Sequence, residues 1–362
     1  MYDFTPIRQI RRIYASLLEL GRLPAIADEI NKSVAENSAA IRDLREIPRF
    51  TPSPNQSQPE APQINEVTFR LDQFRSMLLA KLNEPLLCID VGARWGADDA
   101  LLKLKERAKL LCFDPDEEEC RRIQAMHPVD EVEYVPLALS SDGRDLSLTI
   151  TKKPEASSIF PPVEALHQHF PALDMMEPER VVTVQSTSLD KFLADRSLKK
   201  PDLFKLDTQG SELDILTGAL SNLSAACMID IEVEFNPLYH GQALFSDIDV
   251  FLRSQGFALW RLPLLVHYTP ENFKPAETPV HAASTPGRVQ AISPGNGQLY
   301  WGQAHYVRAE CLITSQTPIY TQQAIRTAAI ASAYGYWDLA LMVLEKCAET
   351  KKDAATLRTL LK

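Results

Sequence analysis

Residues 86–96, LLCIDVGARWG, constrain the fold of this 362-residue chain more than any other stretch. Apolar residues on both faces predict a central parallel strand covered by helices on each side, and Asp90 is its one acid. Gly92 and Gly96 then allow a tight turn and a close approach of the backbone to a ligand. The spacing lacks the G-x-G-x-x-G of dinucleotide-binding loops. It predicts an open α/β sheet with Asp90 at the ligand-binding crevice.

A second apolar run, LLCFDP at residues 110–115, ends in another acid, Asp114. An acid at the tip of the second strand of a mononucleotide-binding unit accepts hydrogen bonds from ribose hydroxyls. A glycine turn and a ribose acid without a pyrophosphate loop indicate S-adenosylmethionine. The alternative is a generic doubly wound sheet whose acids only cap helices.

Further polar residues follow the later predicted strands. Leu139 and Ser140 end the third strand, over residues 132–140, and we expect them beside the adenine. The fourth strand, in PDLFKLDTQGSE at residues 201–212, ends in Asp207. Within it, Lys205 should pair with an acid such as Asp90 or Glu232, because an unpaired buried ammonium is expensive.

The fifth predicted strand, in residues 226–239, carries Asp230, Glu232 and Glu234 on one face, since strand side chains repeat every second residue. Three like charges on one buried face are costly, so we expect only one or two of them inside. Asp207 and Glu232 are the candidate bases for the chemistry. His240, on the exit loop, is a weaker candidate, because a loop histidine is more often solvated.

Net charge and cysteine usage exclude several classes of function. A net charge of −10 argues against a nucleic-acid partner, which would require clustered Lys and Arg. The six cysteines are scattered and indicate reduced core residues. No apolar run could span a bilayer and the amino terminus lacks a secretory signal, so we expect a cytoplasmic protein. No His/Cys cluster has zinc spacing, and we predict no metal, although the acids of strands four and five could gather a divalent cation for a diol acceptor.

The chain divides into four predicted regions. Two amphipathic helices form an arm over residues 1–50, and a Pro-rich linker covers residues 51–64. The main domain spans residues 65–315, with an irregular segment at 154–179 that should close over a substrate, and a helical tail covers 316–362. The apolar stripe of the arm predicts self-association or docking onto a partner.

These pieces resemble the FkbM family of S-adenosylmethionine-dependent methyltransferases. The resemblance covers residues 84 to about 350 and rests on DVGARWG, CFDPD, SLDKFL, DLFKLDTQGSELDILTGA, IEVEFNPLYHGQALF and QGFALWRL. Three positions depart from the family pattern: Asp114 replaces the commoner Glu, Arg94 a usual Asn and Gln303 a frequent acid. Arg94 could contact the methionine carboxylate directly or weaken the turn.

The resemblance implies a class I, Rossmann-like sheet of seven mostly parallel strands. It implies methylation of a hydroxyl on a sugar, glycolipid or related metabolite. The alternatives are a nitrogen or carboxylate acceptor, or a non-catalytic protein that binds the cofactor. The predicted cofactor-binding residues are Asp90, Gly92, Ala93, Gly96, Asp114, Leu139, Ser140 and Asp207, and the predicted catalytic residues are Asp207, Glu232 and His240.

Overall fold

The computed structural model describes residues 64–126, 129–269 and 297–362. The chain divides into two compact units, Met1–Ala61 and Pro62–Lys362, and all described residues belong to the second. The predicted arm over residues 1–50 and the linker up to residue 63 lie outside the described residues.

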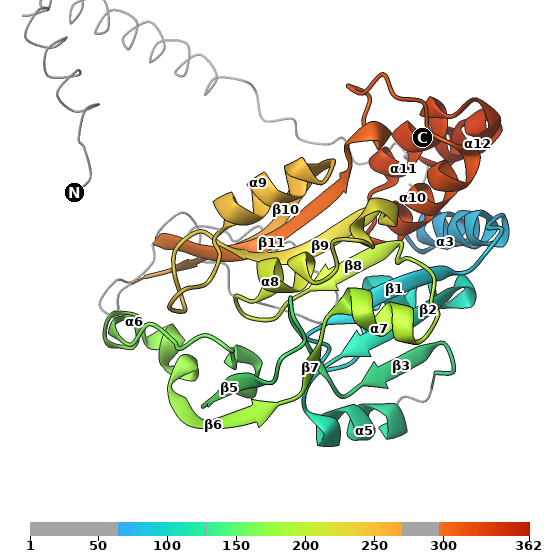
Figure 1. The fold of residues 1–362 in the computed structure, drawn as a ribbon. Coiled ribbons are helices and arrows are strands. Elements are labelled where there is room, and N and C mark those ends of the chain that lie inside the picture. Colours follow the sequence, from blue (N-terminus) through green and yellow to red (C-terminus); the bar gives the residue numbers. More distant parts are fainter. Residues whose placement is uncertain (1–63, 127–128, 270–296) are drawn as a thin grey trace, which may run out of the picture. The chain divides into compact units, whose positions relative to one another are not determined.

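A seven-stranded sheet forms the centre of the second unit (Figure 1). Its strand order is β10-β11-β9-β8-β1-β2-β3. The five strands from β9 to β3 are parallel, and β11 runs antiparallel to both of its neighbours. The strands are β1 (Leu86–Val91), β2 (Ala108–Phe113), β3 (Val132–Val135), β8 (Leu203–Leu206), β9 (Met228–Glu234), β10 (Phe257–Tyr268) and β11 (Gln298–Arg308).

Helices cover both faces of this sheet, as the apolar runs of the central strands require. One face packs against α7 (Leu189–Asp195), α8 (Glu212–Thr217) and α9 (Phe245–Ser254). The other packs against α3 (Ile64–Ala80), the short α4 (Asp99–Leu102), α10 (Thr321–Ala333), α11 (Trp337–Lys346) and α12 (Lys351–Leu360). Figure 1 shows α3 gathered with α10, α11 and α12 beside the sheet, while α5 (Glu117–Met126) lies by β3.

The second face changes character along the strands. Cys88, Leu203 and Met228 of three parallel strands form an apolar row with Val307, near the carboxyl end of the antiparallel β11. Two residues closer to the carboxyl ends of the parallel strands, and two residues earlier on β11, the corresponding row is charged or polar. Apolar helix residues pack on the first row only. The polar row lies closer to the carboxyl ends of the parallel strands, which form the ligand-binding edge of an open α/β sheet.

A segment between β3 and β8 stands apart from the main sheet. It contains β4 (Ala138–Leu139), β5 (Leu146–Thr151), α6 (Ala165–His169), β6 (Pro178–Val184) and β7 (Ser186–Thr187). β5 and β6 form a two-stranded antiparallel sheet, and β4 pairs with β7. Phe170, Leu173 and Met176 of this segment share a small core with Leu238 and Tyr239, which follow β9. The predicted closing segment therefore packs on the exit loop of β9.

The last two strands are longer than the sequence predicts. We expected strands over residues 257–260 and 305–313, whereas β10 has twelve residues and β11 begins at Gln298 and ends at Arg308. Register shifts interrupt their pairing, the first of them between Leu259 and Arg261. Bulges break the two-residue periodicity on which a strand prediction depends.

Candidate active site

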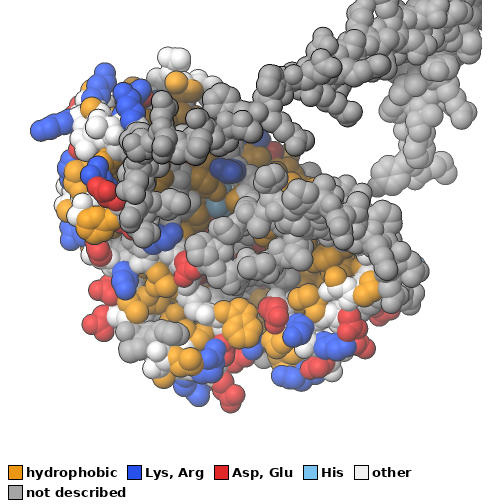
Figure 2. Space-filling view, turned by 180° about the vertical axis from the view of Figure 1, so that it is seen from behind, with side chains coloured by type: hydrophobic (Ala, Val, Ile, Leu, Met, Phe, Trp, Pro, Cys, Tyr) orange, Lys and Arg blue, Asp and Glu red, His pale blue; other side chains and the backbone are white. Residues whose placement is uncertain are grey.

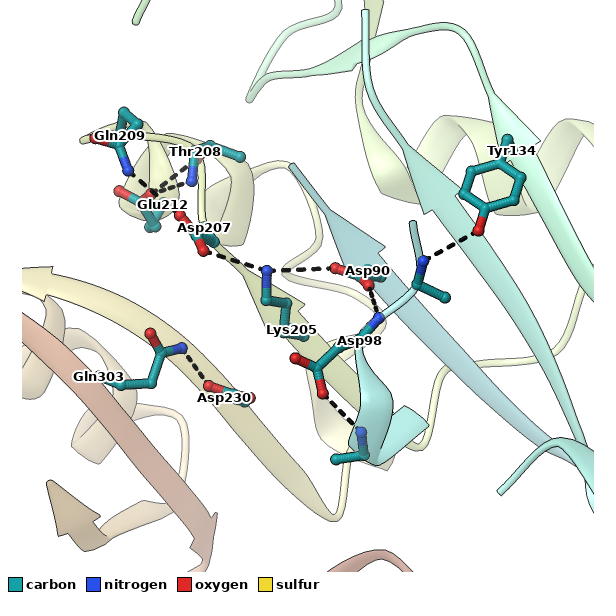
Figure 3. Close-up of polar contacts among 12 residues, drawn as sticks. Asp90, Asp98, Tyr134, Lys205, Asp207, Thr208, Gln209, Glu212, Asp230 and Gln303 are labelled. Atoms are coloured by element: carbon teal, nitrogen blue, oxygen red, sulfur yellow. Dashed lines mark hydrogen bonds and ion pairs between the residues drawn. The ribbon is translucent and has the colours of Figure 1, made fainter. Parts of the chain in front are cut away.

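Lys205 is the centre of a buried charge row at the ends of the parallel strands (Figure 3). The register places Asp90, Lys205, Asp230 and His305 side by side on β1, β8, β9 and β11. Lys205 Nζ lies 3.6 Å from Asp90 Oδ1 and 3.3 Å from Asp207 Oδ2. His305 Nε2 lies 3.1 Å from Asp230 Oδ1. The expected pairing of Lys205 with Asp90 is confirmed.

Burial and charge pairing compete within this row. Burial raises the pKa of Asp90 to about 6, although Lys205 and the backbone N–H of Asp98, at 2.9 Å, both favour its charged form. Burial opposes the charge on Lys205 too. Carboxylates, chiefly Asp207 and Asp90, outweigh it and raise the pKa of Lys205 above its ordinary value. Lys205 therefore remains an ammonium.

The glycine turn after β1 brings two strand ends together. The N–H groups of Gly92 and Ala93 both donate to the Phe113 carbonyl, at 3.0 and 3.2 Å. Gly92 has φ of 85°, and a Cβ there would lie 1.9 Å from the backbone carbonyl oxygen of Asp207. Gly96, with φ of 107°, closes the turn. The close approach at Gly92 is thus to the Asp207 backbone, which fixes the turn against the end of β8.

Asp114 follows β2 and is buried, with 7% of its surface exposed. Its Oδ1 accepts a hydrogen bond from the Asp116 N–H at 2.8 Å, and burial raises its pKa to about 6. Arg94 lies 3.0 Å from Asp116 Oδ2 and so ties the glycine turn to the loop after β2. A contact from Arg94 to a methionine carboxylate stays a prediction.

Leu139 and Ser140 are both buried where β4 ends. Leu139 belongs to the core on the α7 side of the sheet. The Ser140 hydroxyl lies 2.8 Å from that of Ser186 and accepts a hydrogen bond from the Gly143 N–H at 2.9 Å. Both residues hold this loop in place, and their contact with an adenine stays a prediction.

All three acids of β9 are buried, where we expected one or two. Partners from other strands explain the difference for Asp230, whose carboxylate accepts hydrogen bonds from Gln303 and His305. Burial alone would raise the pKa of Asp230, but these two partners lower it below its ordinary value. Gln303 lies opposite Glu232 in the register. Because its side chain is an amide, it adds no further carboxylate beside the acids of β9.

Burial raises the pKa values of the other two acids of β9, Glu232 and Glu234. Burial raises the pKa of Glu232 well above its ordinary value, and the neighbouring Asp207 carboxylate raises it further. Burial raises the pKa of Glu234 likewise, followed by the charge of Glu212. Among the described residues, Glu234 Oε2 has no hydrogen-bond partner. A carboxyl group with a raised pKa binds a proton more readily. The raised pKa values of Glu232 and Glu234 therefore reduce the like charge that makes three buried acids on one face costly.

The side chain of Gln209 contacts both Asp207 and Glu232. It is not among the site residues predicted from the sequence. Its Nε2 donates to Glu232 Oε2 at 2.7 Å and lies 3.3 Å from Asp207 Oδ1. Its backbone is left-handed, with φ of 59°. The signal in the sequence that could have identified Gln209 is its position in the turn between Asp207 and Gly210. The rare conformation that directs its side chain is not readable from residue type.

Glu212 holds this turn from the first turn of α8. Its buried carboxylate accepts hydrogen bonds from the Thr208 N–H at 2.6 Å, the Thr208 hydroxyl at 2.9 Å and the Gly210 N–H at 3.0 Å. A carboxylate at the start of a helix is also favoured by the helix dipole. The position of Gln209 is therefore fixed on both sides.

His240 and its neighbour Tyr239 differ sharply in environment. His240 is exposed, and its backbone N–H donates to the Pro161 carbonyl at 2.8 Å. Tyr239 is buried, and its hydroxyl lies 2.8 Å from the Ala156 carbonyl and 3.0 Å from Gln209 Oε1. The structure brings Asp207, Glu232 and Tyr239 together around Gln209.

The donor set fits S-adenosylmethionine. Asp114 offers a buried carboxylate at the end of β2, and Asp90 Oδ1 is buried without a hydrogen-bond partner among the described residues. The glycine turn lies between them in sequence. The strand order, this turn and the two acids define a class I methyltransferase that uses S-adenosylmethionine.

Residues 90–259 match the methyltransferase FkbM domain. This match confirms the resemblance of the motifs to the FkbM family of S-adenosylmethionine-dependent methyltransferases.

Two curated relatives match at low identity. The 2-O-methyltransferase NoeI of Sinorhizobium fredii is 24% identical over 185 residues, covering 49% of this chain and 76% of the relative. The hexuronic acid methyltransferase AglP of Haloferax volcanii is 25% identical over 215 residues, covering 57% and 82%. Among solved structures, the magnesium protoporphyrin IX methyltransferase of Synechocystis PCC 6803 matches with a TM-score of 0.31 and 12% identity, over 70% of this chain and 86% of that one.

The described residues hold neither a metal-binding cluster nor a membrane-spanning helix. Within ranges 64–126, 129–269 and 297–362, no three or more His, Cys, Asp or Glu side chains are grouped to hold a metal ion. In the same ranges, no helix has the length and apolar character needed to cross a membrane. On the side opposite to Figure 1, acidic, basic and hydrophobic side chains are interspersed on the surface (Figure 2).

Proposed function

We propose that this enzyme methylates a hydroxyl group of a sugar or a sugar-containing metabolite. The observation that carries the proposal is a pair of acids that share one amide donor, Gln209 Nε2: Asp207 directly follows β8, and Glu232 lies on the adjacent strand β9. Methylation of a hydroxyl requires removal of its proton, whereas methylation of a carboxylate does not. This pair, in which Glu232 is buried and Asp207 is half-buried, supplies the proton acceptor.

S-adenosylmethionine supplies an electrophilic methyl group on a sulfonium, and the chain must align the acceptor oxygen and take its proton. Glu232 is the better proton acceptor, because burial and the Asp207 charge raise its pKa. A base of higher pKa accepts a proton more strongly once ionised. Asp207 Oδ2 lies 3.3 Å from Lys205 Nζ, and the Asp207 backbone carbonyl lies against the Gly92 turn.

The names of two relatives support a sugar acceptor. One is a 2-O-methyltransferase and the other a hexuronic acid methyltransferase. The first name specifies an oxygen acceptor, and the second a sugar acid. Both relatives align over more than two thirds of their own length.

The test uses S-adenosylmethionine with a tritiated methyl group and a panel of nitrophenyl glycosides of neutral hexoses and hexuronic acids. We expect label in a glycoside, and the label should survive mild alkali because a methyl ether is stable to it. Label lost in mild alkali would show a methyl ester and overturn the proposal. Label on amines but on no glycoside would overturn it equally.

Variants of the acids then separate their roles with the acceptor so found. Glu232→Gln should lose turnover by about 10²- to 10⁴-fold, the usual contribution of a general base, while S-adenosylhomocysteine affinity is retained. Asp207→Asn should lose turnover and affinity together. His240→Ala should have a smaller effect than either. Loss of turnover in His240→Ala with both acid variants active would move the base to the exit loop.

A further inference from the structure

The side chain of Gln209 lies between two acids and a tyrosine hydroxyl. Nε2 faces Glu232 Oε2 at 2.7 Å and Asp207 Oδ1 at 3.3 Å, while Oε1 lies 3.0 Å from the Tyr239 hydroxyl. With Glu232 ionised, as a base must be, a carbonyl oxygen in place of Nε2 would face two carboxylates. The amide nitrogen is therefore a donor to the acids, and Figure 3 shows Gln209 beside Asp207 and Glu212.

The backbone of Gln209 is held at an energetic disadvantage. A φ of 59° places it in the left-handed region, where a residue with a Cβ costs about 1 kcal/mol. The adjoining hydrogen bonds to Glu232 and Tyr239 are lost if the turn relaxes. Strained conformations of this kind concentrate at functional sites, where the surrounding structure enforces them.

The same residue is tied to the segment between β5 and β6. The Ser158 hydroxyl donates to the Gln209 carbonyl oxygen at 2.7 Å. Tyr239, which contacts the Gln209 side chain, lies 2.8 Å from the Ala156 carbonyl of that segment. Gln209 thus connects the two acids to the segment that packs on the exit loop of β9.

We infer that Gln209 is a positioning residue that orients Glu232 for proton removal: its amide occupies Oε2 and leaves Oε1 to accept the acceptor's proton. This inference rests on the proposed function, in which Glu232 is the base. The charged and titratable groups facing Glu232 come from several elements. They are Lys205 on β8, Asp207 after it, Glu212 on α8, Glu234 on β9, Tyr239 on the exit loop and Tyr268 on β10.

The acids among these groups disfavour a charge on Glu232, whereas Lys205 favours it, and Gln209 Nε2 adds a hydrogen-bond donor at 2.7 Å. A hydrogen bond to the ionised form of a carboxyl lowers its pKa. Removing the Gln209 side chain should therefore raise the pKa of Glu232. A carboxylate in its place should raise that pKa further, because it replaces a donor with a like charge.

The experiment compares Gln209→Gly and Gln209→Glu with Ser197→Gly as a matched control. Ser197, with φ of 51°, is the other non-glycine residue of left-handed conformation among the described residues, and it precedes β8 at the far end of that strand. Glycine adopts this conformation freely, so both glycine variants should keep melting temperatures near that of the unchanged enzyme. Gln209→Glu keeps the side-chain size and provides the readout if the glycine variant fails to fold.

The first readout is an infrared titration of the full chain without acceptor, with the Glu232 carboxyl band assigned by its loss in Glu232→Gln. We expect the midpoint to rise by about one pH unit in Gln209→Gly, the equivalent of one hydrogen bond to a charged group. The rise should be larger in Gln209→Glu, and absent in Ser197→Gly. Midpoints unchanged or lowered in both Gln209 variants would overturn the inference.

The second readout is the pH profile of kcat with an acceptor that the unchanged enzyme methylates. In Gln209→Gly, kcat should fall about tenfold at neutral pH and recover at higher pH, with KM little changed. A loss of the same size at every pH would overturn the inference, because a raised pKa of the base produces a loss that disappears at high pH. The infrared titration needs no acceptor, so it distinguishes a failure of this inference from a failure of the proposed function.

Discussion

Asp114 combines a predicted binding role with an unfavourable electrostatic position. Its folded pKa of about 6 lies above its ordinary value of 3.8, because burial disfavours the charged form. The sign of the effect on stability follows. The stabilising contribution is fully present below the ordinary pKa and is lost as pH rises through about 6. At neutral pH, the ionised carboxylate therefore destabilises the fold while it remains available to a ribose.

We predict that Asp114→Asn stabilises the protein and weakens cofactor binding. The free energy of unfolding at pH 7, measured with urea, should rise by about 1–2 kcal/mol, because an amide has no charge to desolvate. S-adenosylhomocysteine affinity, measured by calorimetry, should fall by about 1–3 kcal/mol, the cost of leaving hydrogen-bonding groups unpaired.

The control for this prediction is Asp145→Asn, which replaces an exposed carboxylate and should change neither quantity. A destabilised Asp114→Asn variant with unchanged affinity would show that Asp114 is a structural acid. The affinity of the unchanged enzyme should also weaken as pH falls below about 6, where Asp114 becomes protonated.

At the residue scale, the sequence predicts the face on which the acids of β9 lie and the pairing of Lys205 with Asp90, but not the partners of the β9 acids. Asp230, Glu232 and Glu234 were assigned to one face, as observed, since strand periodicity is local. Their full burial depends on groups from β11 and from the turn after β8, which no local pattern reports. Gln209 escaped notice for the same reason, because its contacts require the left-handed backbone of the folded turn.

Among the elements, buried parallel strands are easier to predict than the antiparallel pair at the sheet edge. β1 and β9 are buried at every position and appear in the sequence as continuous or alternating apolar runs. β10 is an edge strand with register shifts, and it contains Pro263, which an edge strand tolerates. Its outer half therefore lacks the pattern of a strand.

The junction of α10 and α11 provides an element-scale prediction. The Tyr336 hydroxyl lies 2.6 Å from His305 Nδ1, and both side chains are buried. Tyr336→Phe leaves this ring nitrogen without its partner, so the free energy of unfolding should fall by about 1–3 kcal/mol. Tyr320→Phe, at a side chain 83% exposed, is the matched control and should have no effect in the same urea titration. Equal stability of the two variants would contradict the prediction.

At the scale of the whole molecule, the C-terminal helices are part of the core. Residues of α10, α11 and α12 share one apolar cluster with α3, β1 and β2. Lys81, which follows α3, pairs with Asp353 of α12, and so links positions far apart in the sequence. Helices at the two ends of the described chain thus stabilise the sheet face that carries Lys205.

The arm over residues 1–50 allows a prediction for the complete chain. Its two predicted amphipathic helices carry an apolar stripe, and residues 62–362 form a compact unit of their own. A chain starting at residue 62 should therefore fold and bind S-adenosylhomocysteine with unchanged affinity. Light scattering should give a monomer mass for this shortened chain and a larger mass for the full chain, because an exposed apolar stripe favours association. Arm variants with Ile7, Ile10 and Leu17 replaced by Ser should behave as the shortened chain does, and a monomer mass for the unaltered full chain would refute self-association through the arm.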